Sequence, residues 1–394
     1  MQSFRIRVGG GTVDDLVEQL DRHLALPCVA WLLGAGISFG AGIPLMVPLT
    51  RRVLDLMAGT EHAPLLDKVR AELPPDAHIE HLLSHLGDYA ALAERSQSKT
   101  TAIGSRDEIE KAHRTVVTHI ADIIRWGYRA ESGTKAEEIG TYKRPLVSVA
   151  GHSAFVGALF STQQAGLHDR RRAVRLFTTN YDTLLEDALA LACVPYWDGF
   201  SGGAVAFRTH RFGQDEPDTG YRAHVIKLHG SIDWHLGPDG KVWRVRDGDA
   251  YPTSTARVLI HPQSTKYVAT QRDPFAAQFD LFRRALTAPS DNVLAVCGYS
   301  FGDDHINQEI ELALERPENK TTLVAFCQEG ARMPECLSQW RALSWGRKVF
   351  IATEKGLYVG KDGPFHSCST GSDRDWWTFN GVTQLLRNGA GGHS

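Results

Sequence analysis

The sequence predicts an α/β fold in which a doubly wound parallel sheet carries helices on both faces. Short apolar runs typical of buried strands recur along the chain, helical segments separate several of them, and glycine or polar residues follow four of them. Strands that alternate with helices form parallel sheets, because each crossover helix packs on a face of the sheet. We expect a helical insertion and a small β-rich insertion to interrupt this core.

The first fifty residues contain the first units of this pattern. A helix is expected over residues 12–26, since two aspartates lie in its first turn and Pro27 follows it. The apolar run 28–33 then predicts a strand. A second helix is expected to start within residues 42–49, after a glycine-rich turn.

Residues 51–142 are predicted to form the helical insertion. Apolar side chains recur there at helical spacing, and Pro74 and Pro75 break the pattern once. The polar stretch 95–107 is expected to be a mobile loop. The apolar positions are Leu54, Leu65, Val69, Leu82, Leu83, Leu86, Val116, Ile120, Ile123 and Ile124.

The second half of the chain returns to strands and helices. Helices are expected over 181–192 and 306–315. Short aromatic strands follow Ser231, and Pro238-Asp239-Gly240 indicates a hairpin between them. The other strand runs are 174–179, 224–228, 258–260, 292–297, 322–326 and 348–352.

These elements predict a discontinuous core made of residues 1–50 and 143–355. The helical insertion 51–142 and a β-hairpin insertion, 231–255, interrupt the core. A C-terminal segment, 356–394, follows, and its Gly-rich end from residue 388 is expected to be disordered.

Composition predicts a cytoplasmic protein without a membrane span. The 394 residues carry a formal net charge of -3, and no apolar stretch is long enough for a bilayer or a secretory signal. The six cysteines are scattered without a C-x-x-C pair, which indicates a reducing compartment and gives no zinc-site spacing. The basic excess of nucleic-acid binders is absent. The arginine-rich run 170–175 is interpreted as a solvated segment, and direct nucleic-acid binding stays open.

Two glycine-bearing turns end strand runs where α/β folds bind nucleotides. Residues 34–38 follow the first strand run, and residues 298–300 follow a later one. Glycine lets the backbone approach a pyrophosphate, and a helix that follows offers unpaired N–H groups. A tight turn that needs a positive φ, or an ordinary strand–turn–helix junction, explains the same residues.

Two polar turns end further strand runs. Asn180 and Asp182 follow the run 174–179, and His229 follows the run 224–228. An amide and a carboxylate two residues apart can both face the crevice at the strand ends, and an imidazole can act there as a general base. Helix capping and a local turn hydrogen bond are the alternatives. Four such turns at one end of a single sheet favour a nucleotide site.

The four turns carry, in order, the motifs of a known family. GAGIS with AGIP, TTNYD, KLHGS and GYSFGDDHIN extend from Gly34 to Asn307. They resemble the sirtuin (SIR2) superfamily, most closely its bacterial SIR2-like branch in antiphage defence, such as the SIR2 subunit of SIR2–HerA systems. The resemblance implies a Rossmann-like fold that binds NAD+ and needs no metal. It implies nucleotide contacts by Gly34, Ala35, Gly36, Ser38, Pro44, Thr179, Gly298, Tyr299 and Ser300.

The same resemblance implies the reaction. Deacylating sirtuins carry Asp-Phe-Arg after the GIP element and a four-cysteine zinc ribbon after the HG motif, whereas this chain has Leu45-Met46-Val47 and no such cysteines. We therefore expect NAD+ hydrolysis to nicotinamide and ADP-ribose. Asn180 would orient the water or a ribose hydroxyl, His229 would accept a proton, and Asp182 would orient the nicotinamide amide or stabilise positive charge.

The resemblance further implies a biological setting. NAD depletion in antiphage defence is expected, together with self-association and a separately encoded partner, either a HerA-type ATPase or an Argonaute-like protein. The helical insertion and the region around Trp376 and Trp377 are candidate contact surfaces. Packing of a last helix against the core is the alternative for the two tryptophans.

Two other functions remain as alternatives. Pro238-Asp239-Gly240-Lys241 faintly resembles a motif of metal-dependent DNA nucleases, and the fold could also sense NAD or ADP-ribose without cleaving it. A group with helical spacing could hold a metal, but we interpret it as one partly exposed helix face. Its members are His78, Glu80, His81 and His85.

Overall fold

A nine-stranded sheet forms the centre of the computed structural model, which describes residues 13–26, 29–131, 133–134, 136–162, 173–237, 240–246, 256–259, 273–287, 291–330, 332–365 and 374–390. The strand order is β16-β15-β14-β13-β12-β1-β4-β8-β5. Every pair from β14 to β5 is parallel, and β15 and β16 extend one edge antiparallel. The strands are β1 (Val29–Leu33), β4 (Val174–Thr178), β5 (Tyr196–Trp197), β8 (Ala223–Lys227), β12 (Asn292–Cys297), β13 (Thr321–Phe326), β14 (Val349–Thr353), β15 (Gly356–Val359) and β16 (Asp362–Phe365).

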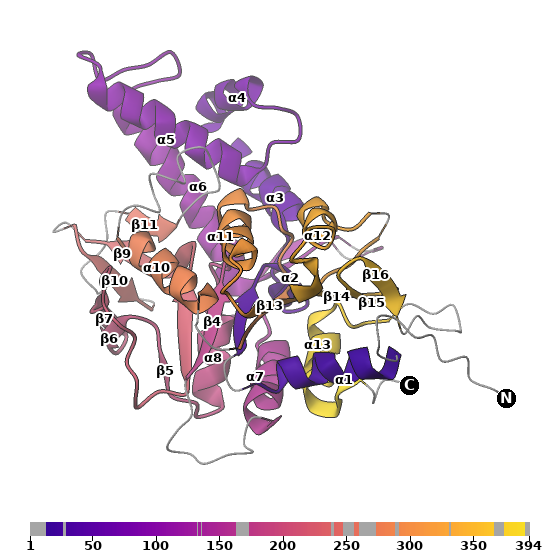
Figure 1. Cartoon of the computed structure of the whole chain (residues 1–394). Coiled ribbons are helices and arrows are strands. Elements are labelled where there is room, and N and C mark those ends of the chain that lie inside the picture. Colours follow the sequence, from indigo (N-terminus) through magenta and orange to yellow (C-terminus); the bar gives the residue numbers. More distant parts are fainter. Residues whose placement is uncertain are drawn as a thin grey trace.

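Helices cover both faces of this sheet, which confirms the predicted doubly wound, Rossmann-like fold (Figure 1). Successive residues of a strand point to opposite faces. Trp31 and Leu33 accordingly pack in one apolar cluster and Leu32 in the other. The first cluster includes helices α1 (Val13–Leu24), α7 (Ala150–Thr162), α8 (Leu184–Leu191) and α13 (Phe379–Asn388). The second includes α10 (Phe275–Leu286), α11 (Asp304–Glu315) and α12 (Glu335–Trp340).

Four helices form a separate group above the sheet in Figure 1, which we call the helical block. They are α3 (Met46–Ala58), α4 (Ala63–Glu72), α5 (Ile79–Arg95) and α6 (Arg106–Trp126). The block has its own apolar cluster, which Leu184 of α8 and Ile232 of β9 join. Pro74 and Pro75 lie between α4 and α5, as predicted.

The helical prediction is wrong at the end of the insertion. Gly127 ends α6 with φ +85°, and β2 (Tyr128–Arg129) then pairs with β3 (Glu138–Ile139). A Cβ at Gly127 would lie 2.6 Å from the Val147 backbone nitrogen. The chain therefore turns away from the helix axis at Gly127, within the segment that was predicted to be mostly helical.

A five-stranded antiparallel sheet makes up the β-rich part of the chain. Its order is β11-β9-β10-β7-β6, and β9 and β10 form the predicted hairpin. The run 258–260 was predicted as a core strand, but β11 pairs with β9 in this small sheet, because an apolar run does not encode which sheet it joins. The strands are β6 (Phe200–Gly202), β7 (Val205–Arg208), β9 (Gly230–Leu236), β10 (Val242–Val245) and β11 (Ala256–Leu259).

The C-terminal segment is ordered further than predicted. Helix α13 extends to Asn388, and Ala390 is buried with its backbone N–H donating to the Asp21 carboxylate over 2.7 Å. Trp376 is buried in the core before α13, so its side chain is not a surface for a partner. The segments and residue types discussed above include positions outside the described residues, namely Thr12, Pro27, Cys28, Arg170, Arg171, Arg172, Pro238, Asp239, Ile260, Cys368 and 391–394.

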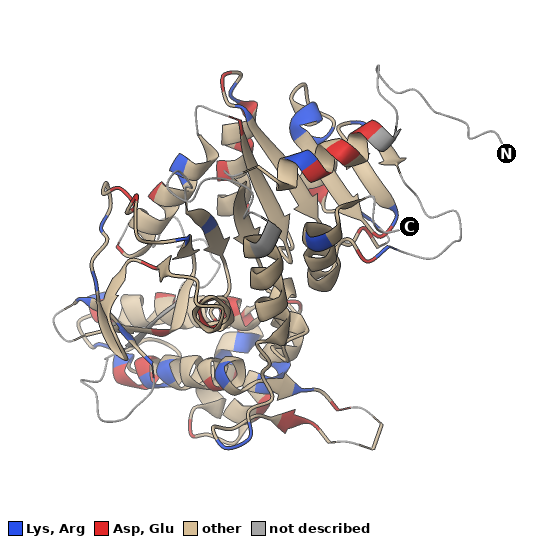
Figure 2. Cartoon of the chain, turned by 90° about the horizontal axis from the view of Figure 1, so that it is seen from below, with Lys and Arg blue, Asp and Glu red and all other residues tan. Residues whose placement is uncertain are grey.

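The described surface has mixed charge. Figure 2 shows Lys and Arg interspersed with Asp and Glu over helices and loops. Arg175, at the end of the predicted basic run, pairs with Glu216 over 2.6 Å. In the described part of the chain, no helix combines the length and the apolar character needed to cross a bilayer.

Candidate active site

The four predicted turns lie at one edge of the large sheet. Strands β12, β1, β4 and β8 are consecutive neighbours and run parallel, so their carboxyl ends meet at the same edge. Backbone hydrogen bonds continue beyond the strands. Gly34 donates to the Cys297 carbonyl over 3.0 Å, Thr179 donates to Leu33 over 3.1 Å, and Leu228 donates to Thr178 over 2.8 Å. The predicted convergence of the turns is confirmed.

Close approach of the turns after β1 and β12 explains their glycines. The Gly36 N–H donates to the Gly298 carbonyl over 2.8 Å. A Cβ at Gly34 would lie 2.5 Å from the Gly298 oxygen, and one at Gly298 would lie 2.5 Å from the Ile37 nitrogen. Of these three glycines only Gly298 has a positive φ, +67°. The glycines therefore let the turns after β1 and β12 pack backbone against backbone at this edge of the sheet.

Ser38 joins Asn180 and Asp182 across 142 and 144 positions of sequence. The Ser38 hydroxyl donates to Asp182 Oδ2 over 2.8 Å and accepts from Asn180 Nδ2 over 3.0 Å. These three residues, which we call the Ser38 cluster, are at most 8% exposed. Asn180 Oδ1 is a buried acceptor without a hydrogen-bond partner among the described residues. The amide is thus anchored through its nitrogen, and its oxygen remains for another ligand.

His152, which no sequence motif indicated, contacts this cluster. His152 lies near the start of α7, is completely buried, and places Nε2 3.4 Å from Ser38 Oγ. Burial lowers the pKa of His152, and the Asp182 charge opposes this effect. Among the residues described, none bonds its Nδ1 atom. No local pattern could have identified it, because a histidine in an apolar helix resembles any core histidine.

Asp182 serves both the cluster and the helix that follows. Its Oδ1 accepts from the Leu184 N–H over 3.0 Å, which fixes the start of α8 three residues later than predicted. Its carbonyl accepts from the buried Lys227 ammonium, which also pairs with Glu186 over 3.2 Å. Burial raises the pKa of Glu186 to about 7, against the attraction of Lys227. The Asp182 carboxylate therefore caps α8 through one oxygen and belongs to the Ser38 cluster through the other.

His229 is held by Asp303, the residue that caps the start of α11. Its Nε2 lies 2.9 Å from Asp303 Oδ2, while Asp303 Oδ1 accepts from the His305 N–H over 3.1 Å as the cap of α11. His229 and Asp303 are each 7% exposed. The pair joins the turn after β8 to the turn after β12. A carboxylate that orients an imidazole supports its use as a base.

Of the other predicted nucleotide contacts, some are exposed at the edge and others are buried beneath it. Ala35, Gly36 and Ser300 are exposed at the edge. Tyr299 is buried, and its hydroxyl bonds the Asp303 carbonyl and Asn307 Oδ1, each over 3.1 Å. Its side chain thus ties the turn to α11. Pro44 is buried in the turn before α3, and Thr179 is half-buried.

The helical block touches the edge through Tyr181. Its hydroxyl donates over 3.0 Å to Glu80 at the start of α5. Glu80 therefore does not share a face with His78, His81 and His85. The three histidines are half-buried, in agreement with the interpretation of a partly exposed helix face. Within the described residues, no group of three or more His, Cys, Asp or Glu side chains could hold a metal ion.

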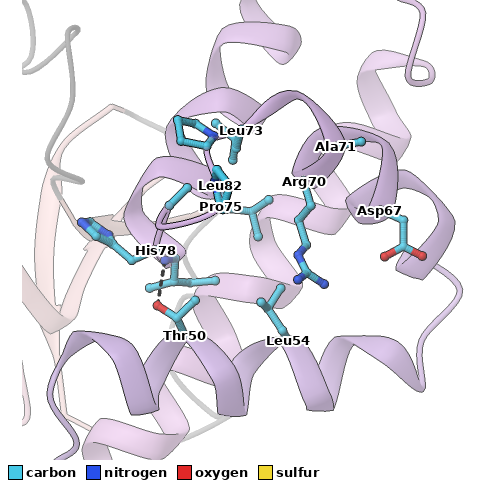
Figure 3. Close-up of a pocket in the computed structure, with 12 residues that line it drawn as sticks. Thr50, Leu54, Asp67, Arg70, Ala71, Leu73, Pro75, His78 and Leu82 are labelled. Atoms are coloured by element: carbon cyan, nitrogen blue, oxygen red, sulfur yellow. Dashed lines mark hydrogen bonds between the residues drawn. The ribbon is translucent and has the colours of Figure 1, made fainter.

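A cavity of about 340 Å³ lies inside the helical block and not at the sheet edge (Figure 3). Arg70 and the half-buried Leu54 border it. The Thr50 hydroxyl on its wall is already occupied, since it accepts from the Ile79 N–H over 2.9 Å and donates to the Met46 carbonyl over 2.8 Å. The cavity is separate from the Ser38 cluster.

Comparison with known families agrees with this geometry. Residues 174–345 match the family model described as the SIR2-like domain, and the match includes the turns after β4, β8 and β12. No curated protein matches the chain. SIR2-like domains bind NAD+, and a large, mostly parallel sheet with flanking helices is consistent with their Rossmann-like fold. This match supports placing residues 174–345 in the SIR2-like superfamily.

Proposed function

We propose that the chain is an NAD+ glycohydrolase that cleaves the nicotinamide–ribose bond. The observation that carries the proposal is the unpartnered Asn180 oxygen, a buried acceptor fixed at the sheet edge beside the glycine turns. Leaving a buried polar atom without a hydrogen-bond partner costs free energy. Such an atom is therefore a candidate for binding a ligand or a water molecule. A water molecule or a ribose hydroxyl can donate to it.

The reaction needs little covalent help from the protein. Nicotinamide leaves NAD+ as a neutral molecule, because the pyridinium takes the electron pair of the glycosidic bond. Water then forms a bond to the ribose carbon and loses one proton, so the products are nicotinamide, ADP-ribose and H+. The protein must orient the ribose and the water and must stabilise the positive charge that develops on the sugar.

The residues divide these tasks. Asn180 Oδ1 accepts from the water or a ribose hydroxyl and so fixes its direction of attack. Asp182, whose carboxylate is bonded to Ser38, places negative charge at the same edge. His229, oriented by Asp303, accepts the proton directly or through the ribose hydroxyls. The exposed Ala35, Gly36 and Ser300 give the nucleotide a backbone surface to approach.

Nicotinamide release from NAD+ tests this proposal. In Asn180→Ala and His229→Ala the rate should fall by roughly 10²–10⁴-fold, the range for removing one general-base or orienting group. Asn292→Ala is a matched control, because Asn292 is also buried and makes two hydrogen bonds but begins β12 at the opposite edge of the sheet. Its rate per folded molecule should equal that of the wild type.

Three results would change the assignment. Wild-type rates in both Asn180→Ala and His229→Ala would remove these residues from the chemistry. Tight NAD+ binding with no nicotinamide release under any condition would favour the sensing alternative. Metal-dependent DNA cleavage lost on changing Asp239, which lies outside the described residues, would favour the nuclease alternative.

We extend the proposal to NAD depletion in antiphage defence, on the family resemblance alone. An enzyme that consumes a cell's NAD needs control, so self-association and a HerA-type ATPase or Argonaute-like partner belong to the same proposal, as does a cytoplasmic location. NAD+ cleavage should therefore be measured with and without co-expressed neighbouring genes. Activity of the isolated chain equal to that of every co-expressed combination would argue against partner control.

A further inference from the structure

We propose that His152 is a positioning residue for this reaction: its Nε2–H donates to Ser38 and thereby fixes the orientation of the Asn180 amide. The inference rests on the proposed NAD+ hydrolysis and extends it to a residue that lies outside the sequence motifs and contacts them through Ser38. The observations that carry it are the 3.4 Å contact between His152 Nε2 and Ser38 Oγ and the complete burial of the histidine.

The valence of one hydroxyl determines which partner donates. A serine hydroxyl has one proton to donate and two lone pairs to accept with. The proton of Ser38 goes to Asp182, and one lone pair accepts from Asn180 Nδ2. The contact with His152 can therefore be a hydrogen bond only if the imidazole donates through Nε2–H. Ser38 then makes three bonds, one to each of His152, Asp182 and Asn180.

This arrangement requires the neutral imidazole with its proton on Nε2. Nδ1 has no partner among the described residues, so a proton there would be buried without an acceptor. Burial lowers the pKa of His152, which keeps the ring neutral near pH 7. The charges of Asp182 and Asp187 act on the His152 pKa in the opposite direction, and burial outweighs them.

The consequence reaches Asn180 through Ser38. Without the donor from His152, the Ser38 hydroxyl keeps its bonds to Asp182 and Asn180 but is held by two bonds instead of three, so it holds the Asn180 amide less rigidly. The backbone of the two glycine turns is held by its own hydrogen bonds, from Gly34 to Cys297 and from Gly36 to Gly298, which do not involve these side chains. Removal of the imidazole donor should therefore lower kcat and leave the KM for NAD+ nearly unchanged.

Two variants separate the hydrogen bond from packing. His152→Phe keeps a ring against Phe379, whose centroid lies 5.2 Å away, and removes the donor. We expect kcat about tenfold lower, the effect of losing one ordinary hydrogen bond. His152→Gln supplies an N–H donor and should restore kcat to within about threefold of the wild type. His23→Phe is the control, since His23 packs on Phe350 of β14 at 4.9 Å and is remote from the Ser38 cluster in the sheet order.

A spectroscopic measurement tests the contact without using activity. Long-range ¹H–¹⁵N spectra of protein with ¹⁵N-labelled histidine, at pH 7.5, should show a neutral His152 ring protonated at Nε2. The signals are assigned by their loss in His152→Phe, and Ser38→Ala should shift them. A ring protonated at Nδ1, or a charged ring, would overturn the inference even if NAD+ cleavage is confirmed.

The two proposals can fail separately. If the wild type releases no nicotinamide with any partner, the proposed function fails, while the spectrum still reports the His152–Ser38 contact. If the wild type is active and His152→Phe has the same kcat, the positioning role is wrong. Equal losses in His152→Phe and His152→Gln would also overturn it, because the donor would then not be what matters.

Discussion

The carboxyl edge of the sheet and the helical block use polar residues in opposite ways. At the edge, hydrogen bonds join residues far apart in sequence, such as Ser38 and Asp182, and the groups are buried. In the block, apart from the Glu80–Tyr181 bond, the side-chain contacts include local and exposed ones such as the Ser105–Glu108 capping box and the Glu72–His85 bond. The cavity is in the block, whereas the unpartnered buried acceptor of Asn180 is at the edge.

This difference between the sheet edge and the helical block indicates which of the two regions carries the active site. The cavity lies between helices of the block, where Pro74 and Pro75 are among its lining residues, and a cavity alone requires no function. Polar groups buried away from water cost free energy unless they are paired, and so an edge that buries several of them has a reason to do so. We therefore assign the site from the polar groups and not from the cavity. Three predictions test this contrast.

The largest effect is expected at Gly298. Gly298→Ala would place a Cβ 2.5 Å from the Ile37 nitrogen at a φ of +67°, so either turn must move. We expect a loss of at least about 2 kcal/mol in the free energy of unfolding, together with loss of NAD+ cleavage. Urea unfolding and nicotinamide release measure the two effects.

Gly40→Ala is the matched control for this substitution. Gly40 ends the short helix α2 (Gly36–Phe39) with φ −66°, and a Cβ there would meet no atom within 4 Å. Its stability and activity should stay at wild-type values. Similar behaviour of the two variants would mean that the glycine turns are not packed against each other as described.

A smaller effect, visible as a pH dependence, is expected at Glu186. Its pKa is raised from 4.5 to about 7 by burial, so the folded protein holds this proton more tightly than the unfolded chain. The stability that Glu186 contributes is therefore fully present below about pH 4.5 and is lost as pH rises through about 7. The stability gap between the wild type and Glu186→Gln should narrow by about 2 kcal/mol from pH 5 to pH 8.

An exposed glutamate of the helical block is the control for this pH effect. The Ser105 N–H and hydroxyl lower the pKa of Glu108, so its contribution is lost only when pH falls below about 4.5. The gap for Glu108→Gln should therefore stay constant between pH 5 and pH 8 in urea unfolding. A gap for Glu186→Gln that widens over this range would contradict the assigned burial of the carboxyl.

The same contrast, between local patterns and contacts distant in sequence, separates the features that the sequence predicts from those that it does not. Periodicity and turn residues predicted the doubly wound sheet and the convergence of four turns, because both depend on local patterns and the parallel connection rule. His152 and the second bond of Asp303 could not be predicted, since each depends on a partner more than 70 positions away. The hairpin after α6 and the sheet of β11 were missed for the same reason, as tertiary packing decides both.

The smallest effects are expected where the two regions meet and inside the block. Tyr181 lies between Asn180 and Asp182, and burial raises its pKa well above the usual value, so its hydroxyl stays protonated and donates to Glu80. Tyr181→Phe removes this bond from the helical block to the edge. We expect kcat to fall about threefold, a fraction of the effect of one hydrogen bond, because the backbone bonds of the edge remain.

Arg70→Ala should have no effect on NAD+ cleavage. Arg70 is exposed, and Figure 3 shows its side chain among the residues that line the cavity. Nothing in the described residues connects its guanidinium to the Ser38 cluster, whereas Tyr181 is part of the turn that carries Asn180. Comparing kcat of the two variants in steady-state kinetics therefore shows whether the cavity of the block or the sheet edge contributes more to catalysis. A larger loss in Arg70→Ala than in Tyr181→Phe would show that the cavity contributes to the site, and the assignment from buried polar groups would have to be given up.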